Sequence, residues 1–187
     1  MQFENLTEND VVINTYNYQK TAYGYVSGRK TGEFQLSLAH KSELAEVFNQ
    51  EFPRQSRPDR LYHILYKQNG RLNNIMINPE NYAEKMSDLI LNFGLENKYQ
   101  HTLGIIEQAA KKQIEQYKNL RDRPAVNREW RQKYRQMLNI EKSLLQYKDY
   151  LPLSARRNLE RQLTASGIKP QPTQTRYGRA YDRTLDI

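Results

Sequence analysis

The first third of the chain alternates hydrophobic and polar residues with a period of two, which is typical of β-strands. The alternation runs in three stretches, over residues 11–18, 23–25 and 34–38. Between the second and third stretches, two glycines bracket Arg29, Lys30 and Thr31. Because glycine favours turns, we predict three strands here, with a hairpin loop at residues 28–32 that carries Arg29 and Lys30 at its tip.

The hydrophobic spacing then changes to that of a helix. Ser42 is a favourable N-cap residue and Pro53 stops a helix, so we predict one over residues 42–52. Four hydrophobic residues would share one side of it: Leu44, Val47, Phe48 and Phe52.

A second hairpin is predicted around Asn69-Gly70, because both residues tolerate the positive φ angles that a type I′ turn requires. Counting outward from the turn gives the opposed residues of the two strands. Tyr62 faces Ile77 and Ile64 faces Ile75 on one side of the hairpin, and His63 faces Met76 on the other. We expect the first side to be buried.

From Pro79 onward the hydrophobic residues recur every three or four positions, which predicts helices. Four are expected, with bounds set by capping and stop signals. The first begins at Asn78-Pro79 and ends at Gly94, and the second spans about residues 97–120. The third runs from an Asn127 cap to about Tyr150, and the fourth runs from Ser154 to Gly167. The third carries a hydrophobic stripe: Trp130, Tyr134, Met137, Leu138, Leu144 and Leu145.

These elements predict an α+β fold in three parts. Residues 1–78 form an α+β module of antiparallel β-hairpins with one helix, and residues 79–167 form a mainly helical region. Residues 168–187 show no periodicity and are rich in Pro, Gln, Arg and Tyr. We expect this last segment to be an extended or disordered basic arm.

The positive charge of the chain is concentrated near its end. The net charge is +8, yet residues 1–120 carry 14 Lys/Arg against 14 Asp/Glu, and residues 121–187 carry 15 against 7. Such asymmetry indicates a polyanion or an acidic surface as the partner of the basic part. The alternative is a solvated helical face with a basic tail that aids solubility.

Few kinds of catalytic chemistry fit the remaining residues. There is no cysteine, and His40, His63 and His101 show no metal-binding spacing. Residues 28–32 lack the spacing of a phosphate-binding loop. We expect no catalytic residue, no metal and no cofactor, with a nuclease as a minor alternative that needs a carboxylate cluster around Asp59 or Glu33.

The candidate binding residues lie mainly in the basic third, where Arg at helical spacing suits contact with phosphates. On the third and fourth helices they are Arg128, Arg131, Arg135, Lys142, Arg156, Arg157 and Arg161. In the arm they are Arg176, Arg179 and Arg183, and the N-terminal hairpin adds Arg29 and Lys30. The aromatic residues expected to stack on bases or to contact a protein are Trp130, Tyr134, Tyr177 and Tyr181.

Together these features favour a non-enzymatic nucleic-acid-binding accessory protein of phage, plasmid or bacterial type. It would hold DNA, RNA or a nucleoprotein complex mainly by the phosphate backbone, with a protein partner for the arm. The alternative is a structural or assembly subunit, such as a virion or secretion component, that uses its Tyr-, Asn- and Gln-rich surfaces for protein contacts. No stretch is apolar enough to span a membrane, so we expect a cytoplasmic or virion location.

Overall fold

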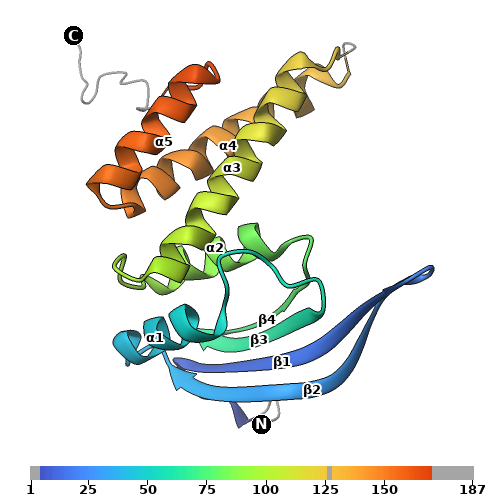
Figure 1. Ribbon diagram of the computed structural model, residues 1–187, viewed down its shortest axis with the longest axis vertical. Helices are drawn as coiled ribbons and strands as arrows, with labels where there is room; N and C mark the ends of the chain where they lie inside the picture. The colour runs from blue at the N-terminus through green and yellow to red at the C-terminus, as the bar shows by residue number, and fades with distance from the viewer. Residues whose placement is uncertain (1–4, 126–127, 170–187) are drawn as a thin grey trace. The chain divides into compact units, whose positions relative to one another are not determined.

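The computed structural model describes residues 5–125 and 128–169, except for the side chains of residues 25 and 26. Its contacts divide the chain into two units, residues 1–109 and residues 110–187. The first unit contains a four-stranded antiparallel sheet, and the second contains helices (Figure 1). The predicted α+β fold is therefore confirmed.

The sheet has the strand order β2-β1-β3-β4. Its strands are β1 (Asp10–Thr21), β2 (Gly24–Ser37), β3 (Arg60–Gln68) and β4 (Arg71–Ile77). Strand β1 is central, since it pairs with β2 on one side and with β3 on the other. The pairing with β3 stops at Asn17, whereas the pairing with β2 continues to Thr21. The far end of the β1–β2 hairpin therefore extends past the sheet as a two-stranded arm (Figure 1).

The prediction of a loop at residues 28–32 is wrong, because these residues lie within β2. The turn comes earlier, before Gly24, whose φ of 121° suits glycine alone. The hydroxyl of Thr21 closes it with a 2.8 Å hydrogen bond to the Gly24 carbonyl oxygen. The pairing of β1 with β2 shifts register on both sides of Tyr16, opposite the stretch of β2 that contains Gly28 and Gly32. Two long strands thus replace the three that the sequence predicted.

The second hairpin forms as predicted. Asn69 and Gly70 have φ angles of 53° and 74°, and the register pairs Tyr62 with Ile77, Ile64 with Ile75 and His63 with Met76. The Glu8 carboxylate accepts hydrogen bonds from the backbone N–H groups of both turn residues. A segment distant in the sequence therefore holds this turn in place.

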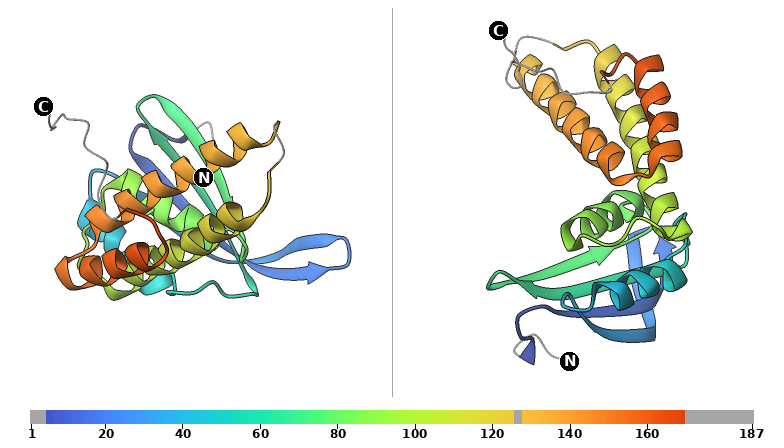
Figure 2. Two further views of the ribbon diagram at one scale, coloured as in Figure 1. Left: turned by 90° about the horizontal axis from the view of Figure 1, so that it is seen from above. Right: turned by 90° about the vertical axis from the view of Figure 1, so that its left-hand side faces the viewer.

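The main core lies between one face of the sheet and two helices, α1 (Lys41–Glu51) and α2 (Tyr82–Phe93) (Figure 2). Aromatic rings dominate it and meet edge to face, which is a favourable geometry. The centroids of Phe52 and Tyr62 are 4.8 Å apart, and those of Tyr66 and Phe93 are 5.0 Å apart. On the opposite face, Leu6 packs with Val12 and Leu65 in a smaller buried cluster.

All five predicted helices are present, with shifted starts. Helix α1 begins one residue before Ser42, and α2 begins at Tyr82 because the Asn78 side chain first forms a turn with the N–H groups of Glu80 and Asn81. Gly94 ends α2 with a φ of 63°, as predicted. The others are α3 (Gln100–Asp122), α4 (Trp130–Tyr150) and α5 (Leu153–Ala165). The Asn127 cap lies outside the described residues.

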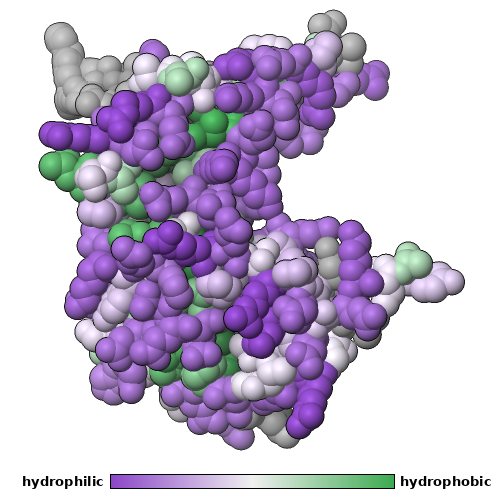
Figure 3. Space-filling view, in the orientation of Figure 1, coloured by the Kyte–Doolittle hydropathy of each residue, from purple (hydrophilic) through white to green (hydrophobic). Residues whose placement is uncertain are grey.

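The contacts group α2 and the start of α3 with the sheet, so the second unit holds the rest of α3 together with α4 and α5. In α4 the buried apolar side chains are Ile140, Leu144 and Tyr147. Of the predicted hydrophobic stripe only Leu144 is buried, whereas Trp130, Tyr134 and Leu138 are exposed by 58%, 51% and 44%. Over both units the visible surface is mostly hydrophilic, with small hydrophobic areas (Figure 3).

Candidate nucleic-acid interface

The two units carry charge of opposite sign. Residues 1–109 contain 11 Lys/Arg against 13 Asp/Glu, whereas residues 110–187 contain 18 against 8. The whole positive excess therefore belongs to the helical unit. A strongly basic unit attached to a slightly acidic one localises any polyanion binding to the former.

Three of the cations in the helical unit have a structural use. Each donates to carbonyl groups at the C-terminal end of a helix, where a positive charge is favourable. The Lys133 ammonium donates to the carbonyl oxygen of Arg123, just beyond the end of α3, at 2.7 Å. The Arg121 guanidinium donates to the carbonyl oxygen of Ser166, just beyond the end of α5, at 2.6 Å. Arg156 donates to the carbonyl oxygens of Lys148, Asp149 and Leu151, at the end of α4.

Another group of cations is left exposed on the outer side of α4. Arg131, Arg135 and Lys142 follow at i, i+4 and i+11, which places them on one face of a helix. That face is opposite the buried Ile140 and Leu144. Arg128 is exposed just before the helix begins. We call these four residues the α4 cationic stripe: Arg128, Arg131, Arg135 and Lys142.

Within the described residues, none of these four cations forms an ion pair or a side-chain hydrogen bond. The nearby Glu141 carboxylate interacts instead with the Tyr117 hydroxyl of α3, and this contact adds to burial in raising the pKa of Tyr117. Glu141 is therefore turned toward α3. The charge of the stripe is free to meet an external anion.

Aromatic side chains lie next to the stripe. The rings of Trp130 and Tyr134 stack in parallel, with centroids 5.4 Å apart and planes 3° apart. Leu138 continues their row one turn later, and all three are exposed. This arrangement places flat, hydrophobic rings beside Arg131 and Arg135, a combination that suits a strand with alternating phosphates and bases.

The other predicted binding residues are distributed over three places. Arg157 and Arg161 are exposed one turn apart on α5, while the neighbouring Arg156 is engaged as described above. Arg29 and Lys30 lie on β2 in the other unit, where Lys30 pairs with Glu33 at 3.4 Å. Residues predicted in the arm lie outside the described residues: Arg176, Tyr177, Arg179, Tyr181 and Arg183.

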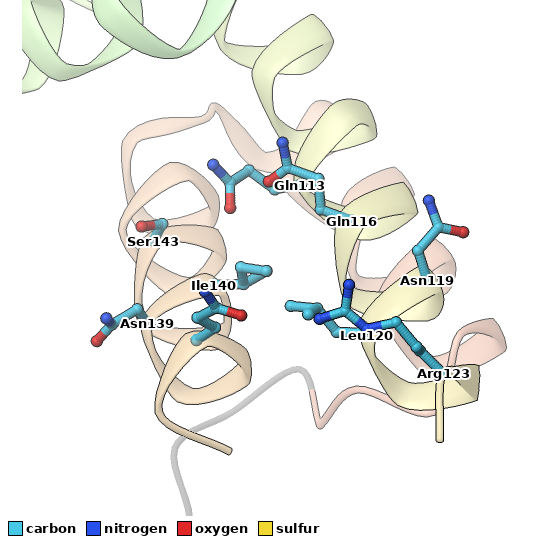
Figure 4. Close-up of a pocket in the computed structure, with 9 residues that line it drawn as sticks. Gln113, Gln116, Asn119, Leu120, Arg123, Asn139, Ile140 and Ser143 are labelled. Atoms are coloured by element: carbon cyan, nitrogen blue, oxygen red, sulfur yellow. The ribbon is translucent and has the colours of Figure 1, made fainter. Parts of the chain in front are cut away.

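A groove between α3 and α4 was not predicted from the sequence. It has a volume of about 560 Å³, and five carboxamide side chains and one hydroxyl line it: Gln113, Gln116, Asn119, Gln136, Asn139 and Ser143 (Figure 4). The signal was present, since three of these residues follow at i, i+3 and i+6 on α3. This spacing is not distinctive in the sequence, because the chain contains 16 Asn and 16 Gln.

No protein-family model, curated protein or solved structure matches this chain. Its function must be argued from its own residues. In the described part of the chain, no three His, Asp or Glu side chains lie close enough to hold a metal ion. None of the described helices combines the length and the apolar character that a membrane crossing needs.

Proposed function

We propose that this chain is a non-enzymatic nucleic-acid-binding accessory protein, of phage, plasmid or bacterial type, that binds through its helical unit. The observation that carries the proposal is the α4 cationic stripe. Arg121, Lys133 and Arg156 donate to helix ends. The four stripe residues, in contrast, have no acidic partner among the described residues. Three exposed cations along one face of α4, with Arg128 just before the helix, match the repeated charge of a phosphate backbone.

Binding would be largely electrostatic. The planar guanidinium groups of Arg131 and Arg135 donate two hydrogen bonds each to phosphate oxygens, and Lys142 contributes a point charge. The Trp130–Tyr134 pair supplies a stacking surface that accepts any base. Arg157 and Arg161 extend the basic surface on α5. The expected outcome is weak sequence preference and strong salt dependence.

The test compares two double variants with the same change in net charge. Arg131→Glu with Arg135→Glu should abolish most binding to a labelled oligonucleotide, because it places carboxylates where phosphates would lie. Arg71→Glu with Lys111→Glu alters exposed cations of β4 and α3 that are not among the proposed contacts. It should leave binding within about twofold of the wild type, since a charge that does not contact the strand is screened by salt. Equal losses in both variants would contradict a localised site.

A second function has one observation in its favour. Trp130, Tyr134 and Leu138 follow at i, i+4 and i+8 and are exposed, which is the pattern of a helix that docks into a groove on another protein. In that case the chain is an assembly subunit, and the same residues contact protein. Binding of a partner that is insensitive to salt, with no binding of oligonucleotides, would favour this function.

A further inference from the structure

The groove between α3 and α4 is built from neutral polar side chains around an apolar floor. Leu120 of α3 and Ile140 of α4 point toward one another at its centre (Figure 4). Around them stand the five carboxamides and Ser143. Of the nine described residues that line the groove, Arg123 alone is charged, and none is acidic.

The polar side chains of this groove have no hydrogen-bond partner in the described part of the chain. Among the described residues, none of the five carboxamides and not Ser143 forms a hydrogen bond through its side chain. Elsewhere in the structure Asn and Gln side chains are used: Asn81 accepts from the Asn78 N–H, and Asn49 accepts from the His101 N–H. Asn119, Gln136 and Asn139 are exposed, and the side chains of Gln113, Gln116 and Ser143 are half-buried. The donor and acceptor groups of the groove are therefore accessible to a ligand that replaces water on them.

A nucleobase has the chemistry that such a groove recognises. Carboxamides donate and accept at the same time, as the edges of unpaired bases do, and Gln or Asn can form two hydrogen bonds to one base. The apolar floor at Leu120 and Ile140 suits the face of a planar ring. Because no acidic residue lines the groove, a neighbouring phosphate is not repelled there, and Arg123 attracts it.

The groove also borders the α4 cationic stripe. Asn139 lies one turn after Arg135 and three residues before Lys142, so these three side chains share a face of α4. A strand whose phosphates lie along the stripe therefore carries its bases past the edge of the groove. In a duplex the same base edges are already paired and turned inward.

We infer that this groove binds unpaired nucleobases, so that the protein binds single-stranded in preference to double-stranded nucleic acid. This inference rests on the proposed function and adds the substrate class. In this mechanism the cations bind the phosphate backbone, and the carboxamides of α3 and α4 bind the bases.

The experiment compares a mixed-sequence single strand with an abasic strand of equal length and with the corresponding duplex, on the full chain. The abasic strand keeps the phosphates and lacks the bases. We expect the single strand to bind at least about fivefold more tightly than either comparison ligand, given the usual strength of base contacts. Gln116→Leu with Gln136→Leu should reduce this difference to the part that stacking on Trp130 contributes. A variant that keeps the whole difference would overturn the groove inference.

Each outcome decides one claim. Equal binding of the normal and abasic strands by the wild type would overturn the groove inference and leave the proposed function standing. Preference for the duplex would overturn it as well. No binding of any of the three ligands at low salt would instead overturn the proposed function. The wild-type comparison needs no variant, so a folding defect in the leucine variant does not affect it.

Discussion

Trp130 is the only tryptophan of the chain, and its ring lies stacked on Tyr134 on the exposed side of α4. Replacing it with alanine should weaken binding of a single strand by about 5- to 150-fold, since a base–aromatic stack is worth about 1–3 kcal/mol. Trp130→Phe keeps a ring and should recover part of the affinity. Fluorescence anisotropy of a labelled strand measures both variants, and an unchanged affinity for Trp130→Ala would exclude stacking at this position.

Arg156 and Arg157 are neighbours with different surroundings. The Arg156 guanidinium donates to three carbonyl oxygens at the C-terminal end of α4. Arg157, in contrast, is exposed and has no contact of this kind in the described structure. Arg156→Ala should lower the free energy of unfolding by about 1–3 kcal/mol, because it leaves these carbonyls without their partner. Arg157→Ala should change it by less than about 0.5 kcal/mol. Urea denaturation of both variants checks the contrast, and equal effects would contradict it.

Tyr82 is buried against the sheet, and its hydroxyl donates to the Pro53 carbonyl oxygen at 2.6 Å. Burial raises its pKa above the ordinary value of 10, and burial also raises the pKa of Tyr62 beside it. Their contribution to stability is therefore full below about pH 10 and is lost as the pH rises further, because only the unfolded state ionises readily.

Denaturation between neutral and alkaline pH checks this sign. The free energy of unfolding should fall above about pH 10. Tyr82→Phe should cost about 0.5–1.5 kcal/mol at neutral pH, through the lost hydrogen bond, and should make the alkaline fall shallower. If the free energy of unfolding of Tyr82→Phe falls as steeply with alkaline pH as that of the wild type, ionisable groups other than Tyr82 cause the fall.

At the scale of elements, the β1–β2 hairpin combines two environments in one strand. Residues 11–16 of β1 have paired neighbours on both sides, whereas from Tyr18 onward the strand pairs with β2 only. A two-stranded ribbon is marginally stable alone. Amide hydrogen exchange should therefore be markedly faster at residues 19–29 than at residues 11–16 of the same hairpin. Uniform protection along β1 would show that the two-stranded end of this hairpin is held by contacts other than the pairing of β1 with β2.

Local turn chemistry made the second hairpin predictable, and its lack made the first one hard to predict. Asn69-Gly70 requires positive φ at both positions, so the turn and the register followed directly. In the first hairpin the chain turns beside Gly24, while Gly28 and Gly32 lie inside β2. A glycine can serve a turn or a strand irregularity, and only the pairing partners across the sheet decide which.

Helix α4 shows the corresponding limit for helices. Its length and its cationic side follow from the residue pattern, and the structure leaves Arg131, Arg135 and Lys142 exposed. Periodicity does not reveal which apolar residues a neighbour covers, so Trp130 and Leu144 were placed in one stripe although only Leu144 is buried. The carboxamide groove lies between two helices, so the spacing of Gln113, Gln116 and Asn119 on α3 shows only one of its two walls.

At the scale of the whole molecule, the division of charge is the main finding. The sequence shows the basic last third, but it does not show which cations are already used inside the fold. Lys133, Arg121 and Arg156 bind helix ends, and this leaves a smaller set available to a ligand. The sheet unit, with 11 basic against 13 acidic residues, has no comparable excess.

The most direct test of the account is the salt dependence of Trp130 fluorescence during titration with a mixed-sequence single strand. Stacking of a base on Trp130 should quench the emission, and phosphate contacts by the four stripe residues predict a slope of log affinity against log salt of about −3 between roughly 50 and 200 mM. Replacing Arg131 and Arg135 with glutamate should roughly halve that slope or abolish binding. Unchanged fluorescence at the lowest salt, or a slope that the double variant leaves intact, would contradict binding through α4.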